Sequence, residues 1–186
     1  MKKLIIIALV ALFSAISVSS QVSVFTKFSD NGTTTPCATI FGTKKLADKT
    51  SFTYFALVTD GWAEAMLGAS YAPEAWVSLG LNCGLEQQPE HMSFRAGGSL
   101  WLGKGSMSLV ALVEKGEGSE NYWYKTTAAY SLSKSISIGA RAWRFTGFGP
   151  LFEYKTGKMI SKIWVMPAHN FENNMNNLVV GIDIKI

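Results

Sequence analysis

The chain has 186 residues, a formal net charge of +4, and 48% hydrophobic against 16% charged residues. This length suits one domain, and the basic residues are scattered beyond the N-terminus, so the charge pattern does not predict a nucleic-acid-binding surface. After the first 20 residues no apolar run is long enough for a transmembrane helix. That leaves two exported classes, a soluble β protein or an outer-membrane β-barrel.

The first 20 residues have the features of a cleaved secretory signal peptide. Lys2 and Lys3 form a positive start, residues 4–13 form a short apolar core, and small residues precede Gln21. The alternative is an uncleaved N-terminal anchor, for which the apolar core is short. We therefore expect a single β-barrel domain at 21–186, with a net charge of +2 once the two lysines are removed from +4.

Apolar and polar residues alternate along the mature chain in short segments separated by Gly, Pro, Asn and Asp. This period of two predicts β-strands, and the separating residues predict turns such as Asp60-Gly61 and Thr156-Gly157. About twelve strands are expected, at 22–29, 38–45, 51–59, 62–71, 75–86, 91–102, 106–114, 121–132, 135–145, 150–155, 159–166 and 178–186.

The segment 62–86 carries the clearest alternation and predicts a long hairpin. Its second half places Leu79 and Leu81 on one side and Asn82 and Glu86 on the other, and Pro73-Glu74 predicts the turn. Because 62–71 is rich in alanine and follows Asp60, a helix capped by Asp60 is the alternative for its first half.

The expected connections also differ in length between the two ends of such a sheet. One end receives 30–36, 60–61, 87–90, 115–120, 146–149 and 167–177, and the other receives 46–50, 73–74, 103–105, 133–134 and 156–158. Long outer loops and short periplasmic turns are typical of transmembrane barrels. The predicted fold class is therefore all-β, an antiparallel up-and-down transmembrane β-barrel of about 10–12 strands.

The two faces of the strands differ in chemistry. One face is aliphatic, with Tyr71, Phe94, Tyr122, Tyr130 and Phe152 near the strand ends, where amphipathic rings suit a membrane interface. The other face holds the charges and all six tryptophans. It predicts a lumen lined by Trp62, Glu64, Trp76, Asn82, Glu86, Arg95, Trp101, Glu114, Trp123, Lys125, Arg141, Trp143, Glu153, Lys162, Trp164 and Asp183. Two interpretations of the indoles stay open: filling of the interior, or a stacking platform for a flat ligand such as a sugar.

The signal-like start, the alternating strands and the last segment, LVVGIDIKI, resemble those of small, porin-like outer-membrane β-barrel proteins of Gram-negative bacteria. The final residue is Ile186, whereas these proteins usually end on an aromatic residue. The resemblance implies a non-enzymatic barrel with a narrow or occluded lumen, in contact with outer-membrane lipid, without a cofactor or metal, that passes or binds a small solute. The alternative is a soluble exported β-barrel or sandwich that binds a ligand.

A third hypothesis is enzymatic. His91-Met92-Ser93 is similar to the His-x-Ser arrangement of outer-membrane lipid A deacylases, in which a glutamate orients the histidine, and Glu114 or Glu64 would serve here. The motif is short, so no catalytic residue is assigned from it. Cys37 and Cys83 allow either a disulfide or two unbridged thiols.

Overall fold

The computed structural model describes residues 19–89, 91–157 and 159–186, all of whose regular elements are strands. The predicted signal peptide lies outside these residues, except for Ser19 and Ser20, which begin the first strand. The twelve strands are β1 (Ser19–Ser29), β2 (Thr34–Ala47), β3 (Thr50–Thr59), β4 (Trp62–Glu74), β5 (Val77–Gln87), β6 (Met92–Lys104), β7 (Met107–Lys115), β8 (Tyr122–Ser131), β9 (Ile136–Trp143), β10 (Gly147–Lys155), β11 (Ile160–Asn170) and β12 (Met175–Lys185).

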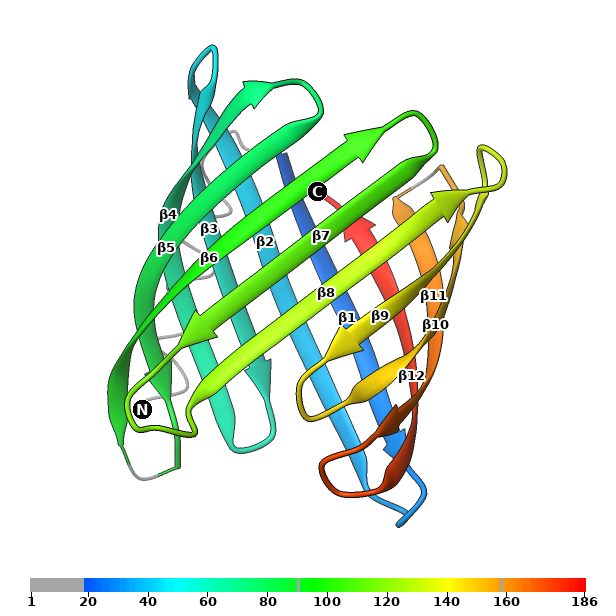
Figure 1. Ribbon diagram of the computed structural model, residues 1–186. Helices are drawn as coiled ribbons and strands as arrows, with labels where there is room; N and C mark the ends of the chain where they lie inside the picture. The colour runs from blue at the N-terminus through cyan, green and yellow to red at the C-terminus, as the bar shows by residue number, and fades with distance from the viewer. Residues whose placement is uncertain (1–18, 90, 158) are drawn as a thin grey trace.

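Each strand pairs antiparallel with its neighbours in the sequence, and β1 closes the barrel against β12. In Figure 1 the tilted strands form one continuous wall in which the first and last strands lie side by side. The closing register runs from Gln21 opposite Lys185 to Ser29 opposite Asn177. The predicted all-β, up-and-down barrel is thus confirmed, at the upper end of the expected strand number.

The helical alternative for 62–71 is wrong, because β4 spans Trp62–Glu74 and pairs with both β3 and β5. Asp60 does not cap a helix. It stands with Gly61, at φ +70°, in the two-residue turn between β3 and β4. This positive φ favours glycine and suits a tight hairpin between twisted strands.

Two predicted connections are corrected, and both involve proline. The gap expected at 167–177 is mostly strand, so only 171–174 join β11 to β12, and Pro167 pairs with Leu178. The pairing of β10 with β11 is interrupted between Phe148–His169 and Phe152–Val165, so the missing N–H of Pro167 costs no hydrogen bond on that side.

The β4–β5 turn also lies two residues later than expected. Ala75 and Trp76 form the turn, and Pro73 stays in β4 where the register with β5 shifts. With both corrections, the connections at the two ends differ less in length than the sequence indicates. The longest joins β7 to β8 at residues 116–121.

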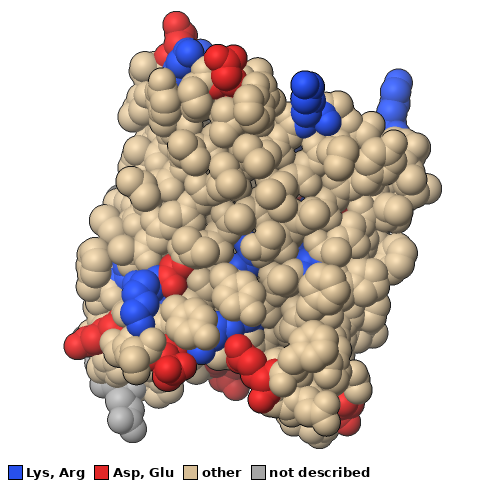
Figure 2. Space-filling model, in the orientation of Figure 1, with Lys and Arg blue, Asp and Glu red and all other residues tan. Residues whose placement is uncertain are grey.

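The outer surface of the barrel is apolar. Leu79, Leu81 and Val113 are 50%, 77% and 58% exposed, although each lies in a strand that is paired with its neighbour. In Figure 2 the central band of the visible face carries almost no charged atoms, and the acidic and basic side chains gather toward the two ends. This face matches the aliphatic side of the sequence pattern. A charged interior and an apolar exterior invert the arrangement of a soluble globular protein.

Among the described residues, no helix has the length and apolarity needed to cross a membrane. Cys37 is buried and Cys83 is exposed, and both thiols are free. The disulfide alternative therefore fails, because one cysteine lies on the inner face of β2 and the other on the outer face of β5.

Candidate functional site

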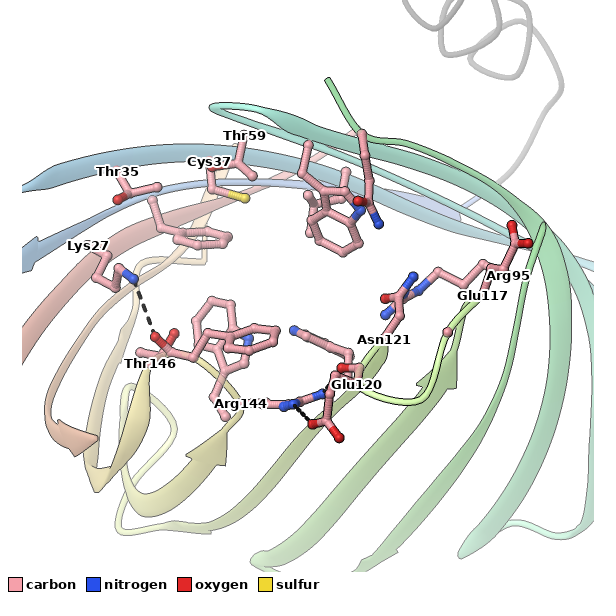
Figure 3. A pocket seen from close by; sticks show the side chains of 18 of the residues that line it. Lys27, Thr35, Cys37, Thr59, Arg95, Glu117, Glu120, Asn121, Arg144 and Thr146 are labelled. Atoms are coloured by element: carbon pink, nitrogen blue, oxygen red, sulfur yellow. Dashed lines mark hydrogen bonds and ion pairs between the residues drawn. The ribbon is translucent and has the colours of Figure 1, made fainter. Parts of the chain in front are cut away.

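A cavity of about 730 Å³ occupies one end of the barrel interior. Its lining comes from β1, β2 and β3 on one side and, on the other, from β6 and the β7–β8 and β9–β10 connections. Figure 3 shows Lys27, Thr35 and Cys37 facing Arg95, Asn121 and Arg144 across the open space. Trp62, Trp123 and Trp143 also line it, so the cavity combines aromatic surface with charged groups at its edge.

One wall holds a buried group that we call the Arg95 cluster: Glu64, Glu86, Arg95 and Glu114, from four consecutive strands. The Arg95 Nε lies 3.1 Å from Glu64 Oε2 and 2.9 Å from Glu114 Oε2, and its Nη1 lies 2.8 Å from Glu86 Oε2. All four side chains are almost fully buried. Three carboxyl groups therefore share a single guanidinium, which holds them together.

Neutral donors complete this cluster around Glu86. Ser93 Oγ donates to Glu86 Oε1 at 2.8 Å, Trp62 Nε1 donates to Oε2 at 3.2 Å, and the Asn121 amide also donates to Oε1. Gly97 pairs with Glu114, and a Cβ at Gly97 would lie 2.8 Å from Glu114 Cγ. The glycine thus makes room for the carboxylate to reach Arg95.

A set of packed rings, which we call the aromatic floor, lies beneath the cavity: Phe25, Trp123, Trp143 and Trp164. The Phe25 ring meets Trp143 edge-on at 5.2 Å between centroids and Trp164 at 5.6 Å, while Trp123 meets Trp143 edge-on at 6.4 Å. Each ring is at most 8% exposed. The four rings come from β1, β8, β9 and β11 and pack against one another in the barrel interior.

A second charged group, the basic group, lies in the barrel interior on β8 to β12, outside the cavity lining: Lys125, Arg141, Glu153, Lys162 and Asp183. Lys162 Nζ bridges Glu153 Oε1 at 2.7 Å and Asp183 Oδ2 at 3.1 Å. Lys125 Nζ lies 4.3 Å from the Trp143 ring centroid, and Arg141 Cζ lies 4.8 Å from that of Trp164. Cations on indole faces explain why these charges and tryptophans share one side of their strands.

Arg144 organises the cavity mouth. Its Nη1 donates to the backbone oxygens of Glu120, at 2.8 Å, and Tyr122, and its Nη2 lies 3.6 Å from Glu120 Oε2. The guanidinium also covers the Tyr122 ring, and the side chain is 6% exposed. Arg144 therefore ties the β9–β10 connection to the start of β8, and Figure 3 shows its contact with Glu120 at the edge of the cavity.

The sequence-predicted lumen residues fall into the three groups above, with four exceptions. Trp62 lines the cavity and donates to Glu86 beside the Arg95 cluster. Trp76 stands in the β4–β5 turn and is 51% exposed, since the later turn removes it from the strand pattern. Trp101 is 39% exposed, and Asn82 is half-buried near Gly97. The function of the whole set as a lumen site stays a prediction.

Several residues that shape the cavity were not predicted. Phe25 was missed because only tryptophan was singled out among the inward-facing rings. Asn121 and Arg144 belonged to the expected strands 121–132 and 135–145, but both lie in connections of the structure, where the period of two no longer sets the side. A single signal was available for them: Arg144 directly follows an inward tryptophan, and Asn121 precedes another by two residues.

The His91-x-Ser93 pair does not form a catalytic arrangement in the described structure. Ser93 is buried and its hydroxyl donates to Glu86, whereas His91 is exposed and precedes β6. Glu64 and Glu114 contact Arg95 instead of a histidine. His169 Nδ1 lies 2.9 Å from Oδ1 of Asn176, its partner in the pairing of β11 with β12.

Comparison with solved structures places this fold among porins. The KdgM porin superposes with a TM-score of 0.62 at 12% identity, over 89% of this chain and 99% of that chain, and the KdgM porin in complex with disordered oligogalacturonate gives the same values. A structure described as "Unveiling the Mechanism Behind the in-meso Crystallization of Membrane Proteins" also reaches 0.62, at 10% identity, over 90% and 83%. No family model and no curated protein matches the sequence. The likeness at these identities is one of fold.

Proposed function

We propose that this protein is a non-enzymatic outer-membrane barrel that holds a small solute in its cavity and restricts passage at the aromatic floor. The exterior supports the membrane location, because exposed aliphatic side chains cover the strands and aromatic rings lie near their ends. Phe28, Phe94 and Tyr122 lie near one end of the barrel, and Tyr71, Tyr130 and Tyr154 near the other. Two such girdles around an apolar band are typical of transmembrane barrels.

Export through a cleaved signal at residues 1–20 is part of this proposal. The positive start, the short apolar core and the small residues before Gln21 support it. A barrel with every strand paired has no open edge, so it satisfies the hydrogen bonds of its backbone without water, as a lipid environment demands.

The aromatic floor is the observation that carries the proposed restriction. Rings that are each at most 8% exposed leave little room for water beside them, whereas the space above them is open. A solute that enters the cavity meets flat indole faces with cations near them, which suits stacking and hydrogen bonding together. The KdgM porin has been solved with oligogalacturonate, which supports a solute-binding function for a barrel of this fold.

A non-enzymatic function is supported by the arrangement of the polar residues. The Ser93 hydroxyl is engaged by Glu86, and the glutamates that would orient His91 are held by Arg95. A hydrolase would need a nucleophile bonded to a base that is itself oriented by a third group.

Planar-bilayer recording tests this proposal. We expect the purified protein to insert and to give a small conductance, and we expect Phe25→Ala to increase it severalfold because the floor loses its central ring. Trp76→Ala is the matched control, since it removes an aromatic ring outside the floor. A heat-modifiable gel shift checks that each variant is folded.

Two results would overturn the proposal. Recovery of the protein in the soluble periplasmic fraction without detergent would exclude the membrane location. A large conductance of the wild-type protein, unchanged by Phe25→Ala, would show that the floor does not restrict passage.

A further inference from the structure

The basic group contains two cations that lack an acidic partner. Lys125, on β8, and Arg141, on β9, form no ion pair with any described carboxylate, although both side chains lie in the barrel interior. The nearby acids are engaged elsewhere: Lys162 holds Glu153 and Asp183. A buried cation without a counter-charge is costly, so this pair calls for an explanation.

Arg141 also carries an unused donor. Its Nε donates to Thr127 Oγ1 at 2.9 Å, but its Nη1 is buried and has no hydrogen-bond acceptor. The residue is only 7% exposed. A guanidinium presents its N–H groups in a planar arrangement that fits anions. The buried Nη1 of Arg141 is therefore a donor that is available to an anion.

The two cations are close enough to act together. Lys125 pairs with Trp143, and Thr127 pairs with Arg141, so the two charged residues are diagonal neighbours on one face of adjacent strands. Such diagonal neighbours lie about 7–8 Å apart at their backbones, a span that one anion can bridge between long side chains. The indole faces of Trp143 and Trp164 hold the two cations without using their N–H donors.

The pair adjoins the cavity through Trp143. This residue lines the cavity, and the half-buried Lys125 lies against its ring with Nζ 4.3 Å from the centroid, so an anion would reach the pair past the edge of this indole. The Arg95 cluster, which would repel an anion, lies on β4 to β7 and is neutralised in part by its own arginine.

We propose that Lys125 and Arg141 form a binding site for one monovalent anionic group, either a halide or the carboxylate of a small organic solute. The proposal is about equilibrium binding of an anion at the aromatic floor, and it holds whether or not the barrel conducts ions.

Iodide is the probe, because it quenches indole fluorescence on contact and this site would hold it between Trp143 and Trp164. We expect iodide to quench the folded wild-type protein in detergent with a saturable component, added to the linear quenching of exposed Trp76 and Trp101. Caesium, a cationic quencher, should show the linear component alone. If chloride removes the saturable component and acetate does not, the site binds halides. If acetate removes it as well, the site also accepts a carboxylate.

Variants locate the site. Lys125→Met and Arg141→Met should each raise the iodide concentration for half-maximal saturable quenching by about tenfold or more, the factor expected from one lost charge-assisted hydrogen bond. Lys44→Met, which removes an exposed lysine of β2, is the matched control and should leave the titration unchanged. Arg141→Lys retains the charge without the planar arrangement of N–H groups and should weaken binding by a smaller factor.

A purely linear iodide titration of the wild-type protein would overturn this proposal, whatever the variants do. Equal saturable quenching in wild-type, Lys125→Met and Arg141→Met proteins would overturn it as well. Because the titration needs no membrane and no current, its outcome is independent of the conductance test of the proposed function.

Discussion

Replacement of Arg95 by methionine should destabilise the barrel strongly. Methionine has a similar length and no charge, so the change removes the guanidinium and keeps much of the packing. The three carboxylates that it contacts at 2.8–3.1 Å would remain with side-chain exposures of 0–6%. The guanidinium that they share would be lost.

The structure sets the size of the effect. Removal of one partner from a buried ion pair typically costs about 3–5 kcal/mol, since the remaining charge is left uncompensated. Here one substitution leaves three buried carboxyl groups without the cation that they share, so we expect a loss at the upper end of that range. Against the total of about 5–15 kcal/mol that is usual for folded domains, this is a large fraction of the stability.

Urea unfolding of the detergent-solubilised protein, followed by tryptophan fluorescence and by the heat-modifiable gel shift, measures this loss. Glu114→Gln is the matched control. It removes one of three carboxylates from a cluster that has a single cation, and its amide oxygen can still accept from Arg95, so we expect a change below about 1 kcal/mol. An unchanged unfolding midpoint for Arg95→Met, at an unchanged denaturant slope, would refute this account of the cluster.

Three further predictions follow from other parts of the barrel. Gly181→Ala should lower the unfolding midpoint in urea, because a Cβ there would lie 2.4 Å from a ring carbon of Trp164 on the paired strand. Arg144→Ala should speed proteolysis of the β7–β8 connection, measured as the appearance of nicked protein, because its guanidinium bonds the backbone at the end of that connection. A spin label on Cys83, in a Cys37→Ser background in liposomes, should collide more with oxygen than with a water-soluble nickel complex, and the reverse order would contradict a lipid-facing β5.

The strands could be predicted because their signal is local. A period of two needs only neighbouring residues, and glycine-containing turns such as Asp60-Gly61 mark where strands end. The predictions failed at Pro73 and Pro167, which were read as breaks. Both stay within strands because the pairing with a neighbour is irregular there, and that irregularity depends on the register of another strand.

The contents of the interior were less predictable than the strands. Alternation separates two faces but does not say which charges meet, because the partners of a residue depend on the stagger between strands. Arg95 contacts glutamates on β4, β5 and β7, and no spacing in the sequence indicates that three of them converge. Arg144 stood in the expected strand 135–145, where alternation put it on the face opposite to Trp143, but β9 ends at Trp143 and Arg144 turns into the cavity mouth from the connection.

The two charged groups differ in a way that bears on the solute. The Arg95 cluster, on β4 to β7, has more carboxylates than cations, and the basic group, on β8 to β12, has more cations than carboxylates. No described ion pair joins the two groups: Arg95 contacts only glutamates of its own cluster, and Lys162 contacts only Glu153 and Asp183. A solute bound above the aromatic floor would therefore have the acid-rich Arg95 cluster at the wall of its cavity and the basic group beyond the lining. Such a field favours a molecule whose anionic group turns toward Lys125 and Arg141 and whose hydroxyl or cationic groups turn toward β4 to β7.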